Sequence, residues 1–184
     1  MTGSSVLWRR LDAPGHDGCR LEDNDGGWRL EGTAVFLEAA AATRLNYEVA
    51  GNHAWHTQRG QVRGWLGNRP VAFSIARTTR GGWTLNGVVL TGLEQCIDLD
   101  LGFTPATNLI QLRRLALRVG QEADVPVAWL DPSAGTLDVL HQRYARKTEN
   151  TYWYEAPRFE YAAMLEVTSE GFMSRYPGLW EIVE

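Results

Sequence analysis

The sequence predicts a mainly β protein whose strands form one large antiparallel meander. Segments of alternating apolar and polar residues fill most of the 184 positions, and short turns rich in Gly and Asn separate them. Leu45, Tyr47 and Val49, for example, alternate with polar neighbours. Such side chains share one face of a strand, so each segment offers one apolar face. Many short strands joined by Gly-rich turns are typical of a sandwich or a barrel, open or closed.

The composition is that of a globular protein with a core of ordinary size. Hydrophobic residues make up 44% of the chain and charged residues 22%. These values and the length predict a single domain over residues 1–184. The net charge of −4 gives no reason to expect nucleic acid as a partner.

Cysteine usage and the N-terminus predict a cytoplasmic location. Cys19 and Cys96 lie far apart and form no CxxC pair, which favours free thiols in a reducing compartment. Residues Met1 to Arg10 lack the apolar stretch of a signal peptide. No segment approaches the roughly 20 apolar residues that cross a bilayer. We therefore expect no membrane span, and either a monomer or a homodimer.

The first half of the chain predicts eight strands. Turn signals such as Asn86-Gly87 separate them, because Asn and Gly supply the positive φ of tight hairpins. The expected strands cover residues 6–10, 18–22, 27–37, 43–50, 53–66, 70–78, 82–86 and 88–92. Between the third and the fourth, the four alanines of Glu38–Ala42 fit either the start of a helix or a corner between strands.

A helix interrupts the meander once, after the alternating segment Ile97–Leu101. Thr104 suits the N-cap, Pro105 suits the first helical position, and Leu109 and Leu112 recur at helical spacing. These residues predict a helix over 105–114 that lies on one face of the sheet. Further strands are expected over residues 114–119, 125–131, 136–147, 150–156 and 159–168.

Two acids stand out as candidate chemistry. Asp98 and Asp100 are two apart on an expected strand, so both carboxylates face the same way, about 7 Å apart. Such a pair could hold a metal, serve as acid and base as in glycoside hydrolysis, or meet an arginine. No third acid or histidine adjoins them, which favours a structural role in which Arg113 or Arg114 ties them to the helix.

Other catalytic patterns are missing from the sequence. His53 and His56 would point to opposite faces of an expected strand, which argues against a shared metal. There is no G-x-S-x-G elbow, G-x-G-x-x-G loop or Walker loop. We therefore expect no metal, no cofactor and no enzymatic activity.

Aromatic residues and arginines suggest a ligand surface. A hairpin through residues 147–150 would place Arg143 and Tyr144 beside Trp153 and Tyr154. An apolar wall with arginines suits an amphiphile with an anionic head, whereas a cross-strand ladder that merely stabilises the hairpin is the slightly favoured alternative. The eight tryptophans, Trp83 among them, similarly fit either core packing or an aromatic groove.

Several short segments along the sequence resemble those of a bacterial family labelled "putative glycolipid-binding". The most specific are the block from Asp98 to Leu115, with its Thr104-Pro105-Ala106-Thr107-Asn108, and the closing Tyr176-Pro177-Gly178-Leu179-Trp180. The resemblance implies an antiparallel sheet curled into an open half-barrel, with one or two short helices covering part of it. That shape is similar to periplasmic carriers that shield lipoprotein acyl chains.

Three functions follow as hypotheses. The first is non-catalytic binding of a glycolipid or fatty-acyl ligand on the concave face, with Arg113 or Arg143 at its polar head. The second is a hydrolase that uses Asp98 and Asp100, and the third is an interaction module that pairs through an exposed sheet edge. The candidate binding residues are Trp83, Asp98, Asp100, Asn108, Arg113, Arg143, Tyr144, Trp153 and Tyr154.

Overall fold

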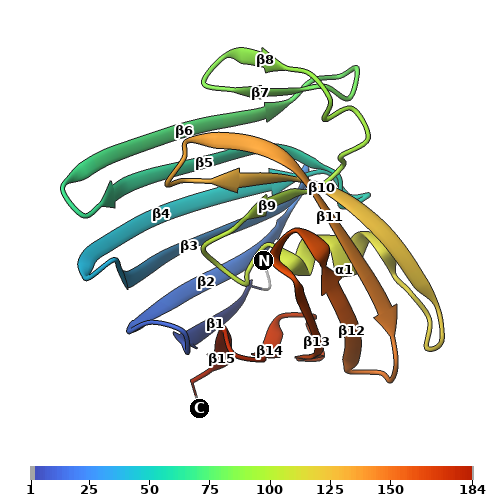
Figure 1. The fold of residues 1–184 in the computed structure, drawn as a ribbon. Helices are drawn as coiled ribbons and strands as arrows, with labels where there is room; N and C mark the ends of the chain where they lie inside the picture. Colours follow the sequence, from blue (N-terminus) through green and yellow to red (C-terminus); the bar gives the residue numbers. More distant parts are fainter. Residues whose placement is uncertain (1–2, 184) are drawn as a thin grey trace.

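A single curled sheet of 15 strands dominates the computed structural model, which describes residues 3–183 (Figure 1). The N-terminal strands are β1 (Gly3–Arg10), β2 (Gly15–Asn24), β3 (Gly27–Glu38), β4 (Ala41–Gly51), β5 (Thr57–Leu66), β6 (Arg69–Arg77), β7 (Trp83–Leu85) and β8 (Val88–Leu90). Then come β9 (Leu99–Leu101), helix α1 (Asn108–Leu115), β10 (Glu122–Asp131), β11 (Thr136–Arg146), β12 (Thr151–Ala156), the 3₁₀ helix η1 (Pro157–Phe159), β13 (Tyr161–Val167), β14 (Met173–Tyr176) and β15 (Trp180–Ile182).

The strand order makes the sheet an open half-barrel, as the resemblance predicts. It runs β8-β7-β6-β5-β4-β3-β2-β1-β15-β14-β13-β12-β11-β10-β9, so β1 and β15 meet in the middle and β8 and β9 are its two edges. All neighbours are antiparallel except β9 and β10. The curl brings the two halves together, since Arg69 on β6 donates to the carbonyl oxygens of Pro132 and Ser133 beyond β10. The meander is confirmed, and the sheet does not close.

Helix α1 lies inside the curl, between the N-terminal strands and β10–β12 (Figure 1). It begins at Asn108, later than the expected residue 105, because residues 105–107 form a turn. The hydroxyl of Thr104, expected as the N-cap, accepts from the backbone N–H of Ala106 and donates to Asp17. The first five residues of the helix are buried, so it fills the concave side of the sheet.

Two local expectations are wrong. The strand expected over 114–119 does not form, because α1 continues to Leu115 and Ala116 ends it in the left-handed conformation. Strand β5 begins at Thr57 rather than at residue 53. The Asn52 side chain accepts from the N–H groups of Ala54 and His56 and folds that stretch into a turn instead.

The segment Glu38–Ala42, which fits either the start of a helix or a corner between strands, forms a turn between strands. Ala39 and Ala40 both have positive φ and form the tight turn between β3 and β4.

Within the described residues, no helix is long and apolar enough to cross a membrane. The edge strand β8 presents Val88 and Val89 at 64% and 69% exposure. A pairing role for this edge stays a prediction, as do the oligomeric state and the cytoplasmic location.

Candidate functional site

A cavity of about 360 Å³ opens at one end of the curl, where β1, β9, β12 and β13 come together with the loop before α1. A volume of this size is at the lower end of the range for ligand pockets. Its walls combine aromatic and apolar side chains with a few buried polar ones. The lining residues that matter below are Arg10, Asp12, Asp100, Phe103, Thr104, Asn108, Trp129, Leu140, Tyr154, Ala156, Phe159, Tyr161, Tyr176, Leu179 and Trp180.

Asp100, Asn108 and Thr104 form the polar wall of the cavity. Asp100 comes from the edge strand β9, Asn108 from the first turn of α1, and Thr104 from the loop between them. All three are at least 94% buried, as their exposed fractions are 6%, 4% and 5%. The short β9–α1 connection therefore places three buried polar side chains together at this end of the curl.

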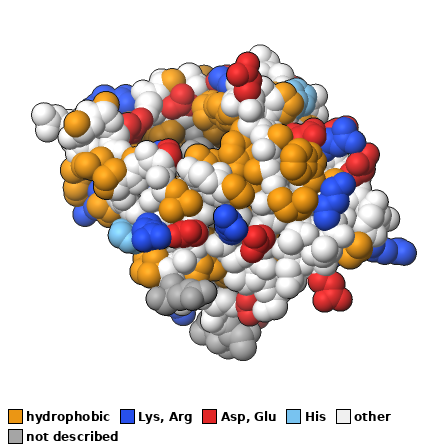
Figure 2. Space-filling model, turned by 60° about the horizontal axis from the view of Figure 1, so that its bottom comes forward, with side chains coloured by type: hydrophobic (Ala, Val, Ile, Leu, Met, Phe, Trp, Pro, Cys, Tyr) orange, Lys and Arg blue, Asp and Glu red, His pale blue; other side chains and the backbone are white. Residues whose placement is uncertain are grey.

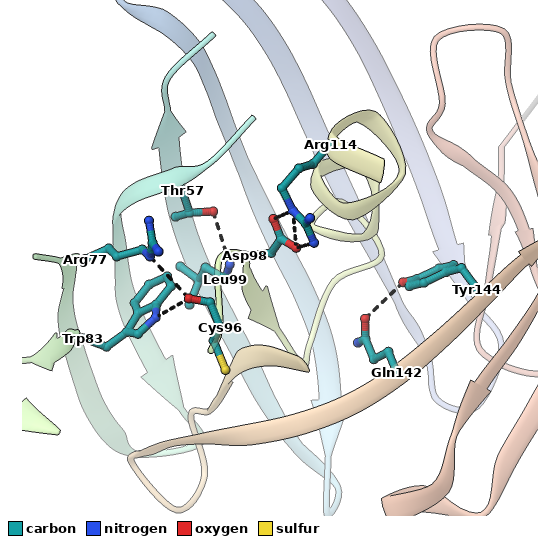
Figure 3. Close-up of polar contacts among 9 residues, drawn as sticks. All are labelled: Thr57, Arg77, Trp83, Cys96, Asp98, Leu99, Arg114, Gln142 and Tyr144. Atoms are coloured by element: carbon teal, nitrogen blue, oxygen red, sulfur yellow. Dashed lines mark hydrogen bonds and ion pairs between the residues drawn. The ribbon is translucent and has the colours of Figure 1, made fainter. Parts of the chain in front are cut away.

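A directed chain of hydrogen bonds holds this wall in place. Asn108 Nδ2 donates to the Tyr144 hydroxyl at 2.8 Å, which donates to Gln142 Oε1 at 3.2 Å. Gln142 Nε2 then donates to Asp100 Oδ2 at 2.5 Å. The Gln142–Tyr144 contact on β11 is visible in Figure 3. The chain begins and ends at cavity residues, so α1 and β9 are oriented through the same two side chains of β11.

Asp100 is a carboxylate without a cationic partner among the described residues. Besides Gln142, its oxygens receive only the Thr107 hydroxyl at 3.5 Å. Burial raises the pKa of Asp100 to about 6, and the hydrogen bonds from Gln142 and Thr107 only partly oppose that effect. Well above pH 6 the ionised Asp100 therefore gives the cavity a buried negative charge.

A second buried acid lies directly behind the polar wall. Asp17 on β2 is fully buried and receives the Thr104 hydroxyl, together with the Tyr47 hydroxyl at 3.0 Å. Burial raises the pKa of Asp17 to about 6, against the lowering effect of both hydrogen bonds. The Thr104 hydroxyl thus donates its single proton to Asp17 and accepts from the backbone N–H of Ala106.

The rest of the lining is largely aromatic. Tyr154 lies with its ring centroid 5.7 Å from that of Tyr176, and Tyr161 lies 5.5 Å from Tyr176. Trp129 and Phe159 meet edge to face at 5.3 Å. Phe159 is 49% exposed, so the aromatic wall reaches the surface. Edge-to-face packing of this kind fixes the rings and leaves flat faces for a ligand.

A neighbouring cavity of about 340 Å³ adjoins this aromatic wall, and the acids Glu38 and Asp131 also line it. It shares Arg10, Phe103, Trp129 and Phe159 with the first cavity and adds Phe36 on β3. On the face drawn in Figure 2, hydrophobic side chains gather around a hollow, with basic and acidic side chains nearby.

A larger hollow, of about 650 Å³, lies on the outer face of strands β1–β5. Arg20, Glu31, Glu48 and Arg63 line it, and its acids already have partners: Arg29 pairs with both Glu31 and Glu48. It lacks an apolar wall of aromatic rings. We therefore take the smaller aromatic cavity as the candidate ligand site.

Three of the nine candidate residues line this cavity, namely Asp100, Asn108 and Tyr154. Tyr144 lies behind them and bonds Asn108. The hairpin expected through residues 147–150 is confirmed, since Tyr144 on β11 faces Tyr154 on β12 with ring centroids 4.9 Å apart. The aromatic cluster therefore forms where the hairpin predicts it.

Asp98 and Trp83 do not line the cavity, and each bonds a neighbouring group of the fold (Figure 3). Asp98, just before β9, receives Arg114 at 2.7–3.0 Å, which is the junction between sheet and helix expected from the sequence. No arginine among the described residues bonds Asp100. The expectation that an arginine ties both acids to the helix is therefore confirmed for Asp98 and wrong for Asp100. Trp83 is fully buried and donates from Nε1 to the carbonyl oxygen of Cys96 at 3.0 Å.

The remaining three candidates lie away from the cavity. Arg113 projects at the opposite end of α1, where it donates to the carbonyl oxygen of Glu170 and lies over Trp55. Arg143 pairs with Glu122, and Trp153 donates to Glu155 Oε1 at 2.7 Å. Arg143 and Trp153 alternate with the inward Tyr144 and Tyr154, so strand geometry turns them outward. The expected meeting of arginines with the aromatic wall therefore does not occur in this cavity.

Sequence reasoning missed several lining residues. Trp129, Tyr161 and Tyr176 face the cavity, and Thr104 and Gln142 hold its polar wall. Trp129 and Tyr161 lie in expected strands, but nothing local indicated that β10, β13 and β14 converge at one end of the curl. Both cysteines are free and buried, and the described residues contain no group of three metal-ligating side chains.

The sequence of the chain matches one protein family. Residues 5–181 match the family described as "Putative glycolipid-binding", so nearly the whole chain belongs to it. A solved structure with the same fold is a DUF1089 family protein from Pseudomonas aeruginosa. It superposes with a TM-score of 0.80 at 23% identity and covers 91% of this chain and 92% of its own. No curated protein matches the chain.

Proposed function

We propose that this protein is a non-catalytic binding protein that holds an amphipathic ligand of the glycolipid or fatty-acyl type in the cavity at the Asp100 end of the curl. The observation that carries the proposal is one cavity with two kinds of wall. Buried polar groups, Asp100 and Asn108, and aromatic rings, Tyr154 and Trp129, line the same cavity. Ligand sites typically combine an apolar lining with a few fixed polar groups in this way.

The ligand lies with its polar head against Asp100 and Asn108. Its apolar part follows Phe103, Trp129 and Phe159 toward the neighbouring cavity, which shares these three residues. The description of the family as glycolipid-binding supports a head of this kind.

Binding is better supported than hydrolysis by Asp98 and Asp100. A paired-acid mechanism needs two carboxyl groups that both reach the substrate. Asp98 is fully buried against Arg114 and does not line the cavity. The other acid of the cavity lining, Asp12, receives two hydrogen bonds from Arg10, which favours a structural role for it.

A cavity-blocking variant tests the proposal. Ala156 lines the cavity, so Ala156→Phe fills it, whereas Ala162→Phe places the same ring on an exposed position of the adjacent strand. Calorimetric titration with decyl β-glucoside below its micellar concentration should show saturable binding to the wild type and to Ala162→Phe, and a loss of at least about ten-fold in Ala156→Phe.

Two further measurements keep this test decisive. Thermal unfolding shows whether Ala156→Phe is folded. If Ala156→Phe does not fold, Leu179→Trp replaces it as the blocking variant, because Leu179 lines the cavity from a half-buried position. Mass spectrometry of an organic extract from protein purified without detergent should find a near-stoichiometric amphiphile in the wild type and less in the blocked variants. Equal binding by blocked and control variants would refute the proposed site.

A further inference from the structure

The polar groups that face the cavity are hydrogen-bond acceptors. Asp100 presents carboxylate oxygens, one of which receives only a 3.5 Å contact from Thr107. Asn108 directs its Nδ2 to Tyr144, which leaves its Oδ1 free to accept. The Thr104 hydroxyl gives its proton to Asp17 and already accepts from the Ala106 N–H, so it has no proton to donate to a ligand. A ligand that satisfies this wall must bring the donors itself, because buried acceptors left unpaired are costly.

The charged groups that line the cavity also limit the kind of ligand head that it can bind. Among the described residues that line it, Arg10 is the one Lys, Arg or His, and both its Nε and its Nη2 donate to the carboxylate of Asp12. Its guanidinium also lies over the Phe36 and Trp180 rings, which holds it at the rim. The negative charge of Asp100 is therefore not neutralised by an arginine or lysine, and a second anion beside it would be strongly disfavoured.

We infer that the site selects an uncharged polyhydroxyl head that donates hydrogen bonds to Asp100 and Asn108, and that it rejects amphiphiles with an anionic head. The inference rests on the proposed function and adds its specificity. The two acceptors come from different elements, β9 and α1, so they suit hydroxyl groups spread around a ring better than a single ammonium group. The aromatic rings of Trp129 and Tyr161 offer flat surfaces for the apolar faces of such a ring.

A series of ligands with one common chain tests the inference on the wild-type protein at pH 8. Decyl β-glucoside, decanol, decylamine and decyl phosphate share ten carbons and differ only in the head. The glucoside should bind at least about ten-fold more tightly than decanol, as expected for hydrogen bonds to a charged acceptor. Decyl phosphate should bind more weakly than decanol.

Asp100→Asn identifies the group responsible. Its Oδ1 can still accept from Gln142, and its amide then turns a donor toward the cavity. We expect the glucoside to lose about ten-fold in affinity, decanol to stay unchanged and decyl phosphate to gain. Asn108→Leu, which removes the other acceptor, should weaken the glucoside alone.

The outcomes separate the two proposals. If no member of the series binds, the proposed function fails and the specificity fails with it. If decyl phosphate, decylamine or decanol binds the wild type as well as or better than the glucoside, only the specificity is overturned. The wild-type ranking decides this even if either variant does not fold.

Discussion

Arg114 donates to both carboxylate oxygens of Asp98, from Nε at 2.8 and 3.0 Å and from Nη2 at 2.7 Å. Asp98 is fully buried and the Arg114 side chain is 17% exposed. Burial raises the pKa of Asp98 although Arg114 opposes that shift. The pair ties the last turn of α1 to the start of β9, and so holds the two elements that carry Asn108 and Asp100.

Removing the cation of this pair should destabilise the protein strongly. Arg114→Ala leaves the Asp98 carboxylate buried without its partner, and such losses cost about 3–5 kcal/mol. Chemical denaturation should show a decrease of that order in the free energy of unfolding. Arg113→Ala is the matched control on the adjacent residue, whose side chain is exposed, and it should cost less than about 1 kcal/mol. Similar losses in both variants would contradict a structural role for the pair.

Asp17 should make stability depend on pH. Its folded pKa of about 6 lies above the ordinary value of 3.8, so the folded state binds the proton more tightly than the unfolded state does. The resulting stability is fully present below about pH 4 and is lost as the pH rises through about 6. Two pKa units correspond to roughly 3 kcal/mol.

Asp17→Asn removes this titration while keeping the shape of the side chain. The free energy of unfolding of the wild type, relative to the variant, should therefore fall by roughly 3 kcal/mol between pH 4 and pH 7. Urea denaturation at several pH values measures it, and Asp100 remains in both proteins, so its own titration cancels. A difference that does not change with pH would show that Asp17 titrates normally.

Gly32 should be intolerant of any side chain. A Cβ at this position would overlap the Tyr47 hydroxyl and come within 2.5 Å of the Gly18 carbonyl oxygen. Gly32→Ala therefore displaces Tyr47 from Asp17 and should lower stability by about 1–3 kcal/mol. At Gly18, on the paired strand, an added Cβ meets only Leu7 Cδ1 at 3.9 Å, so Gly18→Ala should be neutral or slightly stabilising. Thermal unfolding of the two variants gives the comparison.

The turn between β3 and β4 should be improvable. Ala39 and Ala40 have φ of 48° and 64°, a conformation that costs L-residues about 1–2 kcal/mol each. Ala39→Asn with Ala40→Gly supplies the residues that such turns prefer and should raise the free energy of unfolding by about 1 kcal/mol or more. The β7–β8 turn already has Asn86-Gly87, so Gly87→Ala should cause a loss of similar size. An unchanged melting temperature in the double variant would contradict this reading of the turn.

The alternation of side chains predicted most strands because it is a local property. Leu45, Tyr47 and Val49 are buried as expected, at 0%, 4% and 0% exposure. Two of the errors lie where a side chain overrides the local pattern. The Asn52 side chain shortens β5 by bonding the backbone, and Thr104 serves Asp17 rather than capping the helix in the expected place.

The site was harder to predict because its residues come from distant strands. Asp100, Asn108 and Tyr154 were found through motifs, but their meeting with Trp129 and Tyr176 depends on how the sheet curls. Arg143 was placed at a ligand head because it is near aromatics in sequence, and Arg113 was named as the alternative for the same role. Strand alternation for Arg143, and the position of Arg113 at the far end of α1, separate both from the cavity.

The central claim is that an amphiphile binds in the cavity beside Asp100. A crystal structure of the protein with decyl β-glucoside tests it most directly. We predict the glucosyl ring within hydrogen-bond distance of Asp100 and Asn108 and the alkyl chain along Trp129 and Phe159. A ligand bound only on the outer face of β1–β5, or beside Arg113 at the far end of α1, would contradict the account.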